Sequence, residues 1–307
     1  MIKIIFNYLS TGILLILGKI SSYLSISQRA KIGILLGEFF KLISNQKKKL
    51  TLNNLKLSYP KKNKKELLKV VSKSYHNLGI NLIELFTFPY LNDEDLLKYI
   101  SYQDLSELKK IFESFNNGAI ILSGHFSNWE LMAFIVGYLT NIKVTIVTKP
   151  QTNYVFDKIV NKYRCLRGNK VIPMDKAAKT LIECIKNKEM VGLLVDQSAD
   201  PNKDIFVEFL GRPAVTYEAP AKLCLKFKIP LILILFIRQE NYTYKVYYEI
   251  IEYDDLMSKE DAIEKLTIRH VNALEKIINQ YPEQWVWQHN RWKYNINEFS
   301  HNEKNKT

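Results

Sequence analysis

Residues 118–139 read GAIILSGHFSNWELMAFIVGYL, and this stretch decides the fold class. Its first six residues form a short apolar run typical of a buried strand, and residues 131–139 have the apolar pattern of a helix. Apolar runs and amphipathic stretches then alternate along the chain, at 144–148, 154–166, 175–187, 191–195, 217–227 and 230–237. Such alternation predicts an α/β fold with a mixed sheet flanked by helices, to which residues 242–249 add an edge strand and residues 263–278 a late helix.

The turn between the first strand and its helix, Gly124–Glu130, contains the candidate chemistry. A neutral imidazole at His125 can remove a proton from a hydroxyl, and a carboxylate at Glu130 can hold its tautomer and stabilise the imidazolium. Two structural alternatives remain open at this point. Ser127 and Glu130 also fit a helix capping box, and a single histidine in a turn is often only a hydrogen-bonded structural residue. A metal site is not expected, because residues five apart do not share a helix face.

Other sequence features narrow the class of protein. The chain has no G-x-S-x-G elbow, P-loop or G-x-G-x-x-G, which argues against a serine hydrolase, an NTPase and a dinucleotide enzyme. Its net charge of +13 indicates attraction to an acidic partner, either anionic lipid, an acidic protein or nucleic acid. Nucleic acid is not favoured, because the basic residues are scattered and accompany no recognisable nucleic-acid module. Three cysteines lie far apart, which favours a reducing compartment over a disulfide framework.

The string GHFSNWEL resembles the H-x4-D/E signature of the lysophospholipid acyltransferase superfamily and, more narrowly, the lipid A biosynthesis (Kdo-dependent) acyltransferases. Further blocks similar to this family follow in the same order, at Tyr163–Lys170, Val195–Gln197, Phe206–Thr216 and Pro282–Lys293. The resemblance covers roughly residues 50–295. Two positions depart from it: Lys149 precedes Pro150 where the family has Arg, and Glu208 replaces a frequent Pro.

This resemblance implies acyl transfer from a thioester donor, usually acyl carrier protein, to a hydroxyl of a 3-hydroxyacyl chain on a Kdo-bearing lipid A precursor. No acyl-enzyme and no cofactor or metal would be involved. His125 would be the general base and Glu130 would orient it. A glycerol-based or other glycolipid acceptor is the alternative within enzymes, and a non-enzymatic lipid-binding protein is the alternative outside them.

Substrate-binding candidates lie further along the chain. Arg164 and Arg167 are candidates for binding a phosphate or the oxyanion, although both also suit a solvated helix end. Asp196 follows an apolar strand, a position that favours either a site role or a turn. Three tryptophans of the closing block, Trp285, Trp287 and Trp292, could line an acyl-chain slot, but packing in the core or at the membrane interface is favoured.

The amino-terminal segment predicts an uncleaved membrane anchor. Residues 4–18 are uncharged and mostly apolar, and accepting Lys19 extends the run to about residue 26, long enough to cross a bilayer. A buried core helix and a signal peptide are the alternatives. Basic residues after the run, including Arg29 and Lys31, favour a cytoplasmic location for the catalytic domain, at the inner membrane.

The predicted organisation has four parts. Residues 1–45 form the anchor and apolar helices, 46–115 a helical region, 116–298 the α/β acyltransferase domain and 299–307 a polar tail. Within the second part, residues 46–66 are expected to be a polar, solvated connection, and residues 65–88 a helix.

Overall fold

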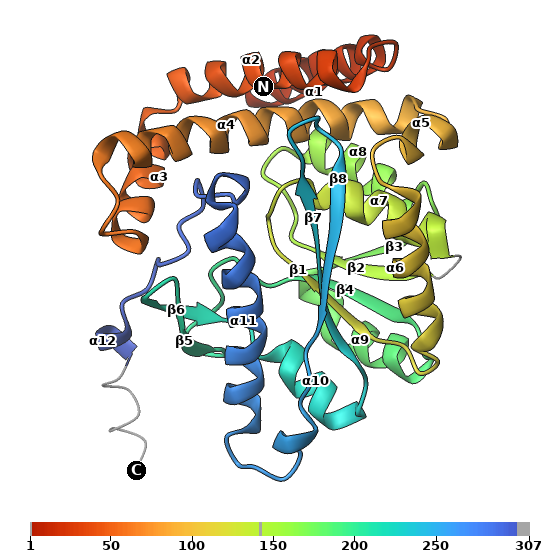
Figure 1. The fold of residues 1–307 in the computed structure, drawn as a ribbon, viewed down its shortest axis with the longest axis vertical. Helices are drawn as coiled ribbons and strands as arrows, with labels where there is room; N and C mark the ends of the chain where they lie inside the picture. The colour runs from red at the N-terminus through yellow and green to blue at the C-terminus, as the bar shows by residue number, and fades with distance from the viewer. Residues whose placement is uncertain (1, 141–142, 300–307) are drawn as a thin grey trace.

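A computed structural model describes residues 2–140 and 143–299, and its centre is a six-stranded sheet in the order β3-β2-β4-β1-β7-β8 (Figure 1). The strands are β1 (Ile120–Ser123), β2 (Val144–Thr148), β3 (Lys170–Pro173), β4 (Met190–Leu194), β7 (Leu231–Arg238) and β8 (Tyr244–Ile250). Neighbouring strands are parallel except β7 and β8, which are antiparallel. The mixed α/β sheet expected from the sequence is therefore confirmed.

Helices cover both faces of this sheet, which explains why its strands are apolar throughout. On β1, Ile120 and Leu122 face a core formed with α9 (Ala177–Lys186), α10 (Ala219–Phe227) and α11 (Ala262–Gln280). Ile121 points to the opposite face and packs with α6 (Tyr102–Ser114) and α7 (Trp129–Thr140). Side chains alternate between the two faces of a strand, so both halves of the run must be apolar.

The remaining elements connect or extend this sheet. A separate antiparallel hairpin is formed by β5 (Ile205–Phe209) and β6 (Arg212–Thr216). The other elements are α8 (Tyr154–Cys165), α12 (Ile296–Phe299) and the short 3-10 helices η1 (Phe88–Tyr90), η2 (Met174–Lys176), η3 (Asp254–Leu256) and η4 (Pro282–Gln284). Phe299 of the predicted tail ends α12, and residues 300–307 lie outside the described residues.

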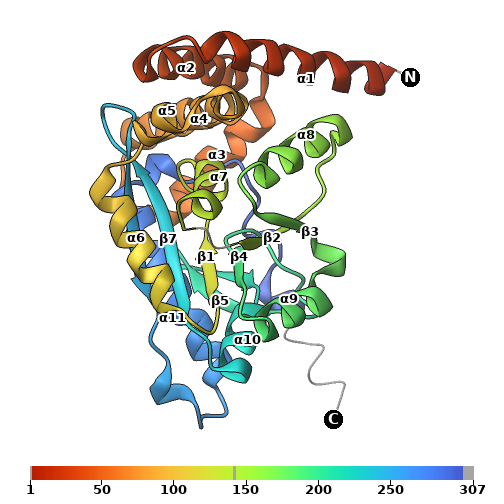
Figure 2. The same ribbon diagram turned by 90° about the vertical axis from the view of Figure 1, so that its right-hand side faces the viewer.

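The amino-terminal region is entirely helical. It comprises α1 (Ile2–Ser21), α2 (Ile26–Ile43), α3 (Asn45–Ser58), α4 (Lys64–Thr87) and α5 (Asp93–Leu97). Figures 1 and 2 show α1 and α2 as a layer on the outer side of α4. Helices α2 and α4 approach closely, since a Cβ atom at Gly79 would overlap the backbone of Gly33 and Gly37.

The expectation of a polar connection over residues 46–66 is wrong, because α3 occupies most of this segment. The helix is polar overall but has one buried side, formed by Thr51, Asn54 and Leu55. The amide nitrogen of Asn54 donates to the carbonyl oxygens of Trp287 and His289 at 3.1 and 3.0 Å. Buried polar contacts of this kind hold the helix in place without an apolar stripe in the sequence.

Helix α1 is the one helix in the described ranges whose length and composition would allow it to cross a membrane. Only 17% of its window Ile4–Ser21 is buried, which differs from a core helix. Its apolar side chains are exposed along its length, at Ile4, Ile5, Phe6, Tyr8, Leu9, Ile13, Ile16 and Ile20. The end of α1 packs on α4, where Gly18 lies against the backbone of Phe86.

Candidate active site

The turn after β1 positions His125 at the end of the sheet. Helix α7 begins at Trp129, and its cap is Asn128, whose side-chain oxygen accepts from the backbone N–H of Leu131 at 2.8 Å. Ser127 is therefore not the N-cap residue of this helix, and the capping box that the sequence allowed with Glu130 is not formed. Its backbone is left-handed, with φ of 47°, a conformation that non-glycine residues rarely adopt. Such backbone strain is found most often at functional sites.

The carboxylate that holds His125 is Asp196. Its Oδ1 lies 2.8 Å from Nδ1 of His125, and its Oδ2 accepts from the backbone N–H of His125 at 2.7 Å. Asp196 follows β4, which lies beside β1, so parallel pairing brings the two strand ends together. Because a carboxylate only accepts hydrogen bonds, Nδ1 of His125 carries the proton and Nε2 presents its lone pair.

Asp196 is buried, with 2% of its surface exposed. Burial alone would raise the pKa of this carboxyl group, but the charge and hydrogen bonds of His125 and the indole N–H of Trp285 outweigh it. The net effect holds the pKa of Asp196 below its ordinary value. Asp196 is therefore an anion at neutral pH, which allows it to accept the hydrogen bond from Nδ1 of His125.

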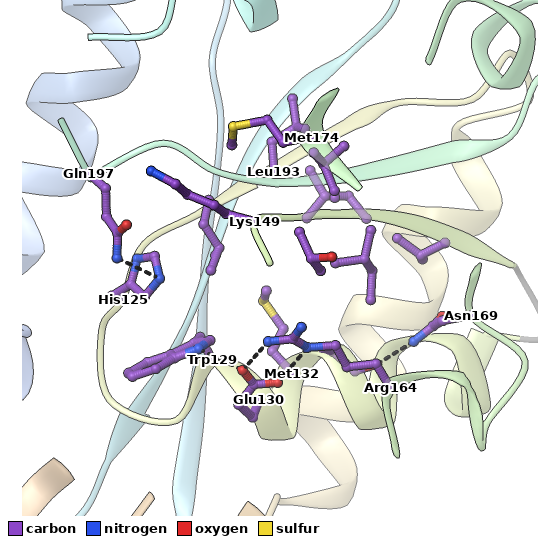
Figure 3. A pocket seen from close by; sticks show the side chains of 18 of the residues that line it. His125, Trp129, Glu130, Met132, Lys149, Arg164, Asn169, Met174, Leu193 and Gln197 are labelled. Carbon is purple, nitrogen blue, oxygen red and sulfur yellow. Dashed lines mark hydrogen bonds and ion pairs between the residues drawn. The ribbon is translucent and has the colours of Figure 1, made fainter. Parts of the chain in front are cut away.

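Glu130 has different partners from those expected. Its carboxylate receives two hydrogen bonds from Arg164, at 2.9 and 2.5 Å, and one from the indole of Trp129 at 3.0 Å (Figure 3). The role of orienting His125, expected for Glu130, is taken in this structure by Asp196. Glu130 points toward Arg164 of α8, whereas Asp196 meets Nδ1 directly from the end of the neighbouring strand. Trp129 contacts both Glu130 and His125. Its indole N–H donates to Glu130, and its ring centroid lies 5.1 Å from that of His125.

Arg164 is held in place by this ion pair. Burial would lower the pKa of its guanidinium, but the charge of Glu130 and the hydrogen bonds between them raise the pKa above its ordinary value. Arg167 lies elsewhere. It forms an ion pair with Asp93 at 2.6 Å and stacks over Phe134. Of the two arginines singled out in the sequence, the structure brings only Arg164 to His125 and Glu130.

A cavity of about 360 Å³ opens at His125 and Gln197. Its polar end also contains Glu130, Lys149 and Arg164 (Figure 3). Its other walls are mainly apolar and are contributed by α7 and by strands β1, β2 and β4; they include Ile121, Met132, Ala133, Val144, Ile146, Gly192, Leu193 and Leu194. A cavity with an apolar wall and a few polar groups at one end is typical of a site for a ligand with a long apolar part.

The closing segment, residues 282–293, fastens the His125 turn to Asp196. The indole N–H of Trp285 donates to Oδ2 of Asp196 at 2.8 Å, and the backbone N–H of Val286 donates to the carbonyl of His125 at 3.0 Å. Residues Phe126 and Trp285 also form an antiparallel bridge. The sequence pattern identified the closing segment but gave no indication of these contacts.

Two further features of the closing segment are resolved by the structure. Trp285 and Trp287 are fully buried in the main core and Trp292 packs against them, so the core interpretation of the tryptophans is the one confirmed. His289 lies close to the site: its Nε2 accepts from the backbone N–H of Ser198 at 3.2 Å. Burial lowers the pKa of His289 to about 4, so its ring is neutral and able to accept this bond.

A buried carboxylate paired with a histidine at the mouth of an apolar cavity defines an enzyme site suited to activating a hydroxyl beside an apolar chain. The sequence model of the bacterial lipid A biosynthesis acyltransferase family matches residues 3–294 of the chain, and the chain belongs to this family. The resemblance seen in the sequence is thus confirmed, and the protein is an acyltransferase that acts in lipid A biosynthesis.

Named relatives agree with this assignment. The chain is 22% identical over 265 residues to the lipid A biosynthesis palmitoleoyltransferase of Escherichia coli (strain K12), covering 85% of this chain and 84% of the relative. It is 23% identical over 263 residues to the lauroyltransferase of the same organism, covering 86% and 84%. The corresponding myristoyltransferase is 22% identical over 255 residues, covering 82% and 77%.

Proposed function

We propose that this enzyme transfers a fatty acyl group from acyl carrier protein to a hydroxyl of a 3-hydroxyacyl chain on a Kdo-bearing lipid A precursor. The observation that carries the proposal is the His125–Asp196 pair at the polar end of an apolar cavity. Family membership supports the lipid A acceptor, and the relatives are named for the transfer of palmitoleoyl, lauroyl and myristoyl groups. The acyl chain of the donor would occupy the apolar part of the cavity.

In this mechanism Nε2 of His125 takes the proton of the acceptor hydroxyl as its oxygen attacks the thioester carbonyl. Asp196 holds the proton on Nδ1 and stabilises the imidazolium that forms; a general base such as His125 contributes about 10²–10⁴-fold in rate. The tetrahedral intermediate then releases the carrier thiolate, which receives the proton from Nε2. An acyl-enzyme would need a nucleophile such as serine or cysteine beside Nε2 of His125. Among the residues that the structure describes, the side chain bonded to Nε2 is the amide of Gln197, which supports direct transfer without an acyl-enzyme.

Glu130 acts in this proposal through Arg164. Their paired side chains and Lys149 line the same cavity, and the three residues form the charged part of its wall. Lys149 and Arg164 would bind anionic groups of the acceptor, while Glu130 fixes the guanidinium in position. Arg167, which is paired with Asp93, is left out of this role.

Membrane association is part of the same proposal, because the acceptor is a lipid. Helix α1 has the length and composition to enter a bilayer and exposes most of its apolar side chains. The net charge of +13 would favour an anionic leaflet, and the body of the protein would lie on the cytoplasmic side of the inner membrane. Arg29 adds nothing to this charge argument, since it is buried and bonds to Tyr99 and to the carbonyl of Ser21.

The test measures acyl transfer by membranes that contain the protein, from radiolabelled acyl carrier protein to three acceptors. These are a Kdo-bearing lipid A precursor, the same precursor without Kdo, and a glycerol-based lysophospholipid. Product with the first acceptor, and a loss of about 10²-fold or more in His125→Ala, is expected. The matched control is His76→Ala, which removes a histidine that pairs with Glu38 on α2. Activity retained in His125→Ala would exclude the general base, and product only with the lysophospholipid would exclude the proposed acceptor.

A further inference from the structure

Gln197 lies where the acceptor hydroxyl must enter. Its amide nitrogen is 3.1 Å from Nε2 of His125, and the residue lines the cavity (Figure 3). Since Asp196 fixes the proton on Nδ1, Nε2 has only a lone pair to offer, so the amide of Gln197 donates to it. An attacking hydroxyl needs the same lone pair. It would therefore displace the amide, and the displaced amide would lie beside the reacting carbonyl.

Acyl transfer also needs a donor for the oxygen of the tetrahedral intermediate, and three backbone amides near His125 already donate to other groups. The N–H of His125 donates to Asp196, that of Ser127 to the carbonyl of Gln284, and that of Ser198 to His289. The guanidinium of Arg164 is held by the carboxylate of Glu130, and we assign it, together with Lys149, to the anionic groups of the acceptor. Side-chain amides are among the groups that serve as oxyanion donors in enzymes.

We propose that Gln197 is the oxyanion donor of the acyl transfer, released from His125 by the incoming hydroxyl. The inference rests on the proposed function and adds a residue that touches the reacting atoms. As the hydroxyl proton moves to Nε2, the new O–C bond forms and the carbonyl oxygen becomes an anion that accepts from the amide N–H of Gln197. When the C–S bond breaks, the carbonyl reforms, the thiolate takes the proton from Nε2, and the amide returns to the lone pair.

Three substitutions test this role. Gln197→Met keeps the length of the side chain but removes the donor, and we expect kcat to fall by about 10²–10³-fold with both KM values nearly unchanged. Gln197→Glu places an acceptor at the same position and should be at least as impaired. Gln197→His retains an N–H donor and should recover part of the lost rate. Gln103→Met is the matched control, because Gln103 is exposed on α6 and bonds to Glu107.

A donor analogue separates oxyanion stabilisation from a purely structural role. In an acyl dithioester the carbonyl oxygen is replaced by sulfur, which accepts hydrogen bonds weakly. The wild type should be slowed by this change, and Gln197→Met should be slowed much less, because the interaction is already lost. The pH dependence of kcat should be the same in both proteins.

Equal slowing of the wild type and Gln197→Met by the dithioester would overturn the proposal, as would a kcat of Gln197→Met within tenfold of the wild type. A shift of the pH profile without loss at its plateau would assign Gln197 to His125 alone and also overturn it. Activity retained in His125→Ala would instead remove the proposed function on which the inference rests, whatever the behaviour of Gln197.

Discussion

Replacement of Asp196 by Asn should switch the tautomer of His125. Oδ2 of Asp196 accepts two donors, the backbone N–H of His125 at 2.7 Å and the indole N–H of Trp285 at 2.8 Å, whereas Oδ1 pairs with Nδ1 of His125. An amide has a single acceptor oxygen, which these two donors would retain. Its NH₂ group must then take the place of Oδ1 and donate to Nδ1, which moves the imidazole proton to Nε2 and removes the base.

The expected loss of rate in Asp196→Asn is that of an enzyme that keeps the geometry of its site but loses its general base. The same change in a serine protease lowers kcat by about 10⁴-fold through the wrong tautomer. We expect a loss of about 10³–10⁴-fold here, equivalent to about 4–5.5 kcal/mol of transition-state stabilisation at roughly 1.4 kcal/mol per tenfold. Because the defect is a tautomer and not an ionisation, raising the pH should not restore the rate.

The assay compares kcat/KM of the wild type, Asp196→Asn, His125→Ala and the double variant. Residues that act as a unit are non-additive, so the double variant should be no slower than His125→Ala alone. Glu130→Gln should be coupled in the same way to Arg164→Met, since these two side chains form the neighbouring ion pair. Activity of Asp196→Asn within tenfold of the wild type, or full additivity with His125→Ala, would refute the assignment of Asp196 as the partner of His125.

Three other substitutions have expected outcomes. Trp285→Phe removes a hydrogen bond to a charged carboxylate and should lower kcat by roughly tenfold or more, whereas Trp287→Phe, whose indole N–H donates to Pro282, should not; equal kcat in the two variants would contradict this. Gly192→Leu should shift the preferred acyl donor toward shorter chains in a competition between donors, because a Cβ here already meets Val144 and Ile146 at 3.4 and 3.8 Å in the cavity wall; an unchanged preference would contradict it. Burial lowers the pKa of His270 from 6.5 to about 3, so between these pH values the unfolded chain binds more protons than the folded protein. The free energy of unfolding therefore falls as the pH decreases from 6.5, by up to about 1.4 kcal/mol per pH unit. His270→Phe should reduce this loss in the melting temperature measured from pH 7 to 4, and an unchanged slope would contradict it.

The parts of the fold that were predictable from sequence are those that depend on local periodicity. Strands β1 and β7 and helix α11 agree with apolar runs and helical spacing, because burial on two faces or on one stripe determines those patterns. The β5–β6 hairpin also has a local signal. Its strands are joined by Leu210 and Gly211, both with positive φ, and a two-residue loop between alternating segments is typical of a hairpin.

The partner of His125 was not predictable in the same way. Glu130 is five positions from His125 in the sequence, and Asp196 is far along the chain, so proximity in sequence favoured the other carboxylate. The order of strands determines which carboxylate reaches His125, because β4, which Asp196 follows, lies directly beside β1, and β2 lies beyond β4. That order is set by long-range packing. One local signal pointed to Asp196, its place at the end of an apolar strand.

The contacts of the closing segment explain why an active site near residue 125 depends on residues near the end of the domain. The segment bridges to the His125 turn through its backbone and to Asp196 through the indole of Trp285. Asn54 of α3 in turn bonds to the carbonyls of Trp287 and His289. One of the amino-terminal helices, α3, is therefore joined to the segment that holds Asp196 and the His125 turn. Under the proposed function the site receives a membrane lipid and a carrier protein, and these contacts would hold His125 in a fixed position relative to the amino-terminal helices.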